Sequence, residues 1–132
     1  MTTPFWCLLV AVLIPYVLAG VGGYLKTQQF GSLDNEHPRD QAAQLEAGSA
    51  GRRAVAAQQN AWEALAVFTA AVVVAHLAGA SEGSAATAAI VFVVARIAHA
   101  SCYVAGLATA RSLSFLVATV SCLWLFGLAI TA

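Results

Sequence analysis

Two groups of polar side chains at helical spacing lie inside long apolar segments of the chain. Residues three, seven or ten positions apart share one face of an α-helix. An ionisable side chain at the centre of a membrane helix costs roughly 2.5–3.5 kcal/mol, so such residues mark a functional site or a structural pair. Their chemistry suits the binding of an anionic ligand. The two groups are Arg53, Asn60 and Glu63, and Arg96, His99 and Tyr103.

Glu63 and Arg96 are expected to pair in mid-membrane. At 1.5 Å per residue, each lies about 16–18 Å along its segment from the same end. These polar groups could also do no more than join helices, since interhelical polar contacts average about 0.6 kcal/mol in membrane proteins. With cations at one end (Arg52, Arg53 and Arg111), the whole array favours a binding site. An anionic group would meet these cations, and an apolar tail would lie in the bilayer.

The composition is that of a membrane protein. The chain has 132 residues, of which 61% are hydrophobic and 9% charged, whereas soluble domains are about 45–50% apolar and about 25% charged. The net charge is +0 and no basic tract is present, so a nucleic-acid partner is not expected. The three cysteines lack metal-like spacing, and no metal site is predicted.

Four apolar spans predict an all-α integral membrane protein, a bundle of four transmembrane helices within a single domain, 1–132. A helix needs roughly 20 residues to cross the hydrocarbon core. The first span is read as a retained helix, because a signal peptide needs a positive start and the first five residues carry no Lys or Arg. A short helix is expected near 40–47. The spans are expected at about 5–25, 52–78, 85–108 and 112–130, with a polar loop over 26–51.

The basic residues predict the orientation in the membrane. Five of the six lie in or beside the first and third connections. By the positive-inside rule both connections, including the 26–51 loop, face the cytoplasm and both termini face outward. The Ala- and Val-rich composition and the short turns look bacterial, so the expected location is a bacterial plasma membrane.

The two polar groups resemble motifs of the MAPEG family, the membrane-associated proteins in eicosanoid and glutathione metabolism. Residues 53–63, Arg-Ala-Val-Ala-Ala-Gln-Gln-Asn-Ala-Trp-Glu, are similar to the second-helix motif of that family. Arg96-Ile-Ala-His99, followed by Tyr103 and Arg111-Ser112, is similar to the motif that covers the third helix and the following turn in the prostaglandin E synthases of the family. Together the motifs cover about half the chain, 52–112. Asn-x-x-Glu alone is a weak motif, but the full set in this order is specific.

The resemblance implies a homotrimer of four-helix subunits, with sites between subunits that open toward the cytoplasm and bind glutathione. Arg111 would stabilise the glutathione thiolate, with Ser112 as a helper, because a nearby cation lowers a thiol pKa from about 8.5. The two carboxylates of glutathione also suit guanidinium groups. Family positions for glutathione match Asn60, Glu63, His99, Tyr103, Arg111 and Ser112. Two further cations, Arg53 and Arg96, complete the predicted pocket.

The sequence departs from the family pattern at three positions. Ala56 stands where the eicosanoid enzymes carry an Arg, Gln59 where a basic residue precedes the Asn, and Phe115 where a Tyr is expected. Arg53, nearer the mouth of the site, is expected to compensate for the two lost cations. The two lost cations count against glutathione as the specific thiol, and the bacterial composition argues against eicosanoid substrates.

The sequence therefore predicts a membrane-embedded transferase or peroxidase that depends on glutathione or another thiol and acts on lipophilic electrophiles, as in detoxification. Its expected partners are membrane lipid, a lipophilic small molecule and further copies of the chain. A non-catalytic lipid-binding or scaffolding member of the family is the first alternative. A small multidrug exporter is the second, and it is disfavoured because residues 1–25 lack the acidic residue on which such transporters rely.

Overall fold

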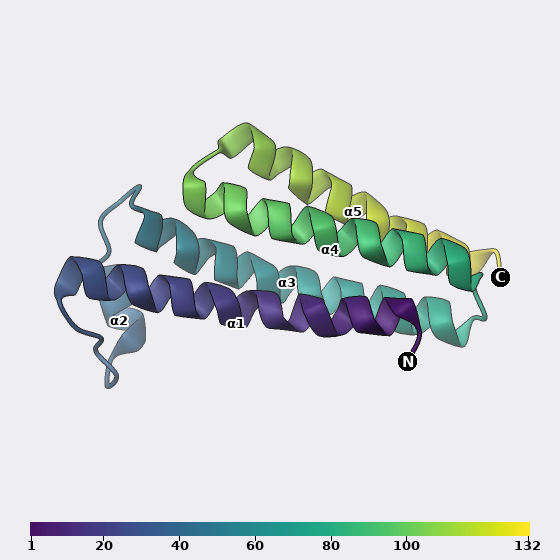
Figure 1. Cartoon of the computed structure of the whole chain (residues 1–132), viewed down its shortest axis with the longest axis horizontal. Helices are drawn as coiled ribbons and strands as arrows, with labels where there is room; N and C mark the ends of the chain where they lie inside the picture. The colour runs from purple at the N-terminus through teal and green to yellow at the C-terminus, as the bar shows by residue number, and fades with distance from the viewer.

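The computed structural model describes residues 1–132 as a bundle of helices without strands (Figure 1). Four of the helices are long and apolar enough to cross a membrane. This confirms the predicted all-α integral membrane protein, which passes the bilayer several times. A short fifth helix lies at one end of the bundle, and both termini lie at the other (Figure 1). The helices are α1 (Thr3–Phe30), α2 (Pro38–Ala43), α3 (Ala50–Leu77), α4 (Glu82–Ala105) and α5 (Ala108–Ile130).

The ends of the helices follow capping chemistry and differ from the predicted spans. α1 continues to Phe30 rather than residue 25, and it ends at Gly31, whose positive φ of 81° suits a glycine. The side chain of Ser49 caps α3 by accepting a hydrogen bond from Arg52 N at 3.2 Å. α5 begins at Ala108 rather than residue 112, so Arg111 lies in the first turn of the helix.

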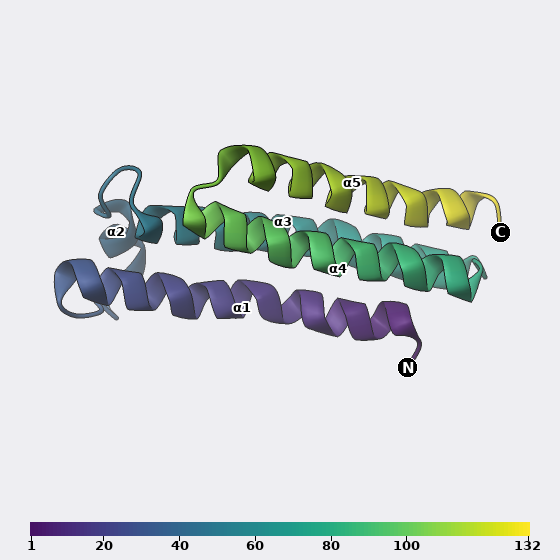
Figure 2. The same ribbon diagram turned by 45° about the horizontal axis from the view of Figure 1, so that its top comes forward.

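α3 and α4 form the middle of the bundle. Figure 2 shows α1 on one side of this pair and α5 on the other, and α4 contacts all three other long helices. The facing surfaces are rich in alanine, including Ala71, Ala88 and Ala89, which are fully buried. Small residues allow membrane helices to approach closely and gain van der Waals contact. Between them the rings of Phe68 and Phe92 stack, with centroids 3.8 Å apart.

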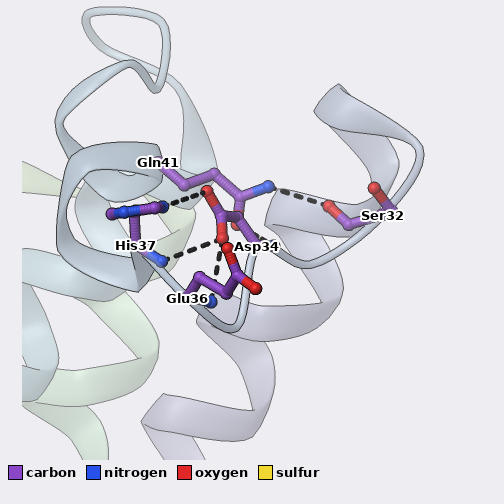
Figure 3. A network of polar contacts seen from close by, with 5 residues as sticks. All are labelled: Ser32, Asp34, Glu36, His37 and Gln41. Carbon is purple, nitrogen blue, oxygen red and sulfur yellow. Dashed lines mark hydrogen bonds and ion pairs between the residues drawn. The ribbon is translucent and has the colours of Figure 1, made fainter.

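The connection between α1 and α3 is ordered by its own polar side chains (Figure 3). Asp34 Oδ1 accepts hydrogen bonds from the backbone N of Glu36 at 2.9 Å and of His37 at 2.8 Å. Its other oxygen lies 3.6 Å from His37 Nδ1. Gln41 on α2 donates to Ser32 O at 2.8 Å and accepts from Asp34 N at 3.1 Å. The turn before α2 is therefore folded onto the helix.

Leu45 anchors this connection to the bundle. Its side chain is only 3% exposed, and it packs where α3 begins, at Gly51. Arg52 strengthens the anchor, since its Nη1 donates to Ala43 O at 2.8 Å and to Leu45 O at 3.1 Å. The close packing requires that position 51 carry no side chain.

Gly51→Val is expected to displace Leu45 and loosen the connection, since an added Cβ would lie 2.9 Å from Leu45 Cδ2. Overpacking of this kind costs about 1–3 kcal/mol, so limited proteolysis between α1 and α3 should accelerate. Gly83→Val is the matched control, because Gly83 is also the second residue of a long helix and an added Cβ there meets nothing within 4 Å. Equal digestion rates for the two variants would contradict this role of Gly51.

Candidate functional site

Arg96 and Asn60 make the central polar contact between α4 and α3. Arg96 is 3% exposed, and its Nη2 donates to Asn60 Oδ1 at 2.8 Å and to Asn60 O at 3.2 Å. The expected ion pair between Arg96 and Glu63 is not formed, and that prediction was wrong. Asn60, one turn earlier on the same helix face, supplies the acceptors instead. The Glu63 carboxylate remains exposed.

A cleft of about 280 Å³ lies between α3, α4 and α5. Its polar groups gather toward the α2 end of the bundle, and its walls toward the termini are apolar. The side chain of Thr119 adds little polarity, because its hydroxyl donates to Phe115 O at 2.9 Å. The polar lining residues are Asn60, Glu63 and Arg96, and the other walls include Val67, Phe92, Phe115, Cys122, Leu123 and Phe126.

His99 carries an unpartnered buried nitrogen. Its Nδ1 lies 3.0 Å from Arg111 O, and since a carbonyl can only accept, Nδ1 must be the protonated nitrogen of the neutral ring. Nε2 is then an acceptor, yet it is buried and has no hydrogen-bond partner. The ring packs against Tyr103 and Phe115, with centroids 5.5 Å and 6.0 Å away. Buried polar atoms are almost always paired, so Nε2 is available to accept a hydrogen bond from a group outside this chain.

Arg111 lies over the ring of Tyr103. Its Cζ is 4.6 Å from the ring centroid, a cation–π contact that contributes roughly 0.5–2 kcal/mol. The backbone N of Arg111 donates to Leu107 O at 2.9 Å, which fixes the residue in the first turn of α5. The guanidinium itself makes no hydrogen bond within the chain, so all five of its N–H donors remain available to a ligand.

Three of the predicted site residues therefore come together: His99, Tyr103 and Arg111. Arg96 lies one turn before His99 on α4 and binds Asn60 of α3. Arg96, Asn60 and Glu63 all line the cleft. Ser112 is exposed and makes no side-chain hydrogen bond.

Arg53 lies apart from this cluster. Its Nε donates to Val104 O at 2.9 Å, and its Nη1 donates to Gly48 O. Its guanidinium is thus held by two backbone carbonyls. That it compensates for the cations missing at Ala56 and Gln59 stays a prediction.

Sequence reasoning noted Phe115 only as a departure from the family pattern and missed the rest of the α5 wall of the cleft. Phe115, Cys122 and Phe126 line it, and their spacing of seven and four residues is a helical signal that was present in the sequence. Without polar members, that stripe does not differ from any other face of an apolar helix.

The sequence profile of the MAPEG family matches residues 3–131. The chain belongs to the MAPEG family. Among curated proteins, no sequence gives a significant match. The match covers nearly the whole chain and confirms the resemblance that was drawn from the motifs at 53–63 and 96–112. It makes this chain a member of a membrane family of glutathione and eicosanoid metabolism, and it leaves the exporter alternative without support.

Asn60→Ala is expected to destabilise this MAPEG protein, because it leaves the buried Arg96 guanidinium without its 2.8 Å acceptor. Loss of a hydrogen bond to a buried charged group costs about 1–3 kcal/mol, which a thermal melt in detergent would detect through the tryptophan fluorescence. Asn60→Asp keeps an acceptor oxygen and should retain most of the stability. Gln28→Ala, at an exposed position near the end of α1, is the control. A melting temperature of Asn60→Ala equal to that of the control would refute the role of this contact.

Proposed function

We propose that this MAPEG protein is a thiol-dependent transferase or peroxidase that uses glutathione and acts on lipophilic electrophiles. The observation that carries the proposal is the Arg111 guanidinium, which lies 4.6 Å over Tyr103 with its donors unused. It stands beside the unpartnered Nε2 of His99, and an apolar cleft lies next to this cluster. The cation would stabilise a thiolate, the free acceptor would accept a hydrogen bond from the thiol compound, and the apolar cleft would bind an apolar co-substrate.

Arg111 would act on the thiol. A free thiol has a pKa near 8.5, and an adjacent guanidinium lowers it by stabilising the thiolate. The proton is released to water at the α2 end. The thiolate then attacks the electrophilic carbon and forms a C–S bond, and the leaving group departs with the bonding electrons. Arg111 changes neither its charge nor its covalent structure in these steps.

A hydroperoxide would react with the same thiolate. The sulfur attacks the terminal oxygen, the O–O bond breaks, and the alkoxide leaves and takes a proton to become the alcohol. A second thiol then attacks the resulting sulfenic acid, releasing water and leaving a disulfide. Two thiols are oxidised and one peroxide is reduced, so no other reductant is required.

The residues present fit glutathione as the thiol. Nε2 of His99 can accept a hydrogen bond from an amide N–H or from the S–H group. The exposed carboxylate of Glu63 matches an ammonium group in charge, and the free donors of Arg111 match a thiolate or a carboxylate. Arg96, Asn60 and Tyr103 would shape the pocket around these groups, and Ser112 would assist Arg111.

The cleft between α3, α4 and α5 would bind the electrophile. At about 280 Å³ it is at or below the lower end of the 300–1,000 Å³ range typical of drug-sized ligands, which favours small apolar molecules over long-chain eicosanoids. The wall residues Phe115 and Leu123 are exposed, so the cleft is open along α5. A molecule dissolved in the bilayer would therefore enter sideways.

We further propose a homotrimer in a bacterial plasma membrane, with both termini outside and the connection before α3 in the cytoplasm. The charge distribution supports the orientation. On α3, Gln59 and Glu63 are exposed and Trp62 is 41% exposed. Polar side chains that face lipid are costly, and a neighbouring subunit would cover them.

Arg111→Ala is expected to abolish thiolate formation on bound glutathione. Absorbance near 240 nm at pH 7 should rise saturably with glutathione for the wild-type protein and stay flat for the variant. Without the cation the thiol pKa returns toward about 8.5, so the signal should reappear only at higher pH. Arg39→Ala, which removes an exposed loop cation, should behave as wild type. An undiminished signal from Arg111→Ala would exclude the assigned role.

A non-catalytic, lipid-binding or scaffolding member is the second candidate. Two observations favour it. Phe115 presents no hydroxyl to His99, with ring centroids 6.0 Å apart, and the Arg53 guanidinium is held by backbone carbonyls. Under this alternative the wild-type protein would show neither thiolate nor turnover, and the cleft would hold lipid.

Phe115→Tyr is expected to increase turnover with glutathione if the protein is an enzyme. The added hydroxyl would supply one more hydrogen bond near His99. A bond of about 0.5–1.5 kcal/mol corresponds to a gain of roughly two- to tenfold in kcat/KM. Phe126→Tyr adds the same group at the other end of the cleft and should give no gain. Equal rates for both variants and the wild type would show that the hydroxyl position is irrelevant.

A further inference from the structure

Arg53 joins the start of α3 to the end of α4 and to the connection that precedes α3. From α3, its Nε donates to Val104 O at 2.9 Å in the last turn of α4. Its Nη1 donates to Gly48 O, at the end of the connection that carries α2. No other side-chain hydrogen bond links α3 to this end of α4, since the Arg96–Asn60 contact lies two turns away.

The packing around the guanidinium is close. Gly106 ends α4 at a positive φ of 80°, and a Cβ added there would lie 3.3 Å from Arg53 Cζ. The backbone of the turn therefore rests directly on the guanidinium. A positive φ and this approach together explain why the position is glycine.

The turn that Arg53 contacts leads directly to Arg111. Only two residues, Gly106 and Leu107, separate α4 from α5. Leu107 N donates to Cys102 O at 2.9 Å, and Arg111 N donates to Leu107 O at 2.9 Å. A shift of Gly106 or Leu107 would thus move the first turn of α5, and with it the guanidinium over Tyr103.

We propose that Arg53 is a positioning residue, which holds the α4–α5 turn against the start of α3 and thereby sets the place of Arg111. Its assigned role is to hold this turn rather than to bind the carboxylates of glutathione, because two of its N–H groups already donate to Val104 O and Gly48 O. The proposal rests on the proposed function of Arg111. The bond to Gly48 also ties the position of Arg111 to the connection between α1 and α3.

The first test is independent of glutathione. Amide hydrogen exchange of residues 106–111 should be faster in Arg53→Gln than in the wild-type protein, by about tenfold or more. Arg52→Gln is the matched control, since Arg52 makes two similar bonds to carbonyls of the same connection, Ala43 and Leu45, but none to α4. Unchanged exchange in Arg53→Gln would overturn the proposal whether or not the protein is an enzyme.

The second test separates positioning from ligand binding. S-methylglutathione keeps both carboxylates and lacks the thiol, so its affinity reports on carboxylate recognition alone. For Arg53→Gln we expect its Kd to stay within about twofold of wild type, while the pKa of bound glutathione thiol rises by about one unit, a tenfold fall in the ratio of thiolate to thiol at a given pH. A Kd that rises tenfold would instead make Arg53 a ligand-binding residue and overturn the proposal.

Arg53→Lys carries the same test with the charge retained, and it also serves if Arg53→Gln fails to fold. A lysine cannot reproduce the planar geometry that reaches two carbonyls, so the thiol pKa should rise as in Arg53→Gln. If the pKa of the bound thiol in Arg53→Lys equals that of the wild-type protein, the charge of Arg53 and not its two hydrogen bonds matters, and the positioning role is overturned. Absence of thiolate in the wild-type protein would refute the proposed function, and the exchange experiment would still decide the role of Arg53.

Discussion

A guanidinium enclosed by helices within a bilayer must find its hydrogen-bond acceptors inside the protein, because lipid tails offer none. Arg96 finds two on Asn60, a side-chain oxygen at 2.8 Å and a backbone oxygen at 3.2 Å. These bonds fix the rotation and the relative height of α3 and α4. With α3 and α4 fixed in this way, His99 and Tyr103 lie on the face of α4 that is turned toward α5. Glu63 lines the cleft without pairing with Arg96.

The rest of the bundle adapts to this pair. Alanines on the facing surfaces bring the helices close, and the stacked rings of Phe68 and Phe92 fill the space between α3 and α4. α5 then closes the cleft from one side and α1 packs on the other (Figure 2). The polar site is thus formed around α4, which contacts α1, α3 and α5.

Much of this arrangement could be predicted from the sequence, because helical periodicity places polar residues on faces. It identified the all-helical membrane fold, the family, and the residues that gather around Arg96 and Arg111. Periodicity does not fix the rotation of one helix against another, so it could not decide whether Arg96 meets Asn60 or Glu63. The place of Arg53 was equally out of reach, since it depends on the carbonyls of Val104 and Gly48 and on the close approach of the two-residue turn after α4, none of which leaves a trace in the sequence.

The shortness of that turn also bears on how the site assembles. His99 and Arg111 are joined by a bond that spans 12 positions of the chain, whereas the contacts of Arg96 and Arg53 with their partners span 36 and 51. Local contacts close with little loss of chain entropy. The α4–α5 hairpin, which carries His99, Tyr103 and Arg111, can therefore form its own contacts first, and the bonds of Arg96 and Arg53 then join it to α3.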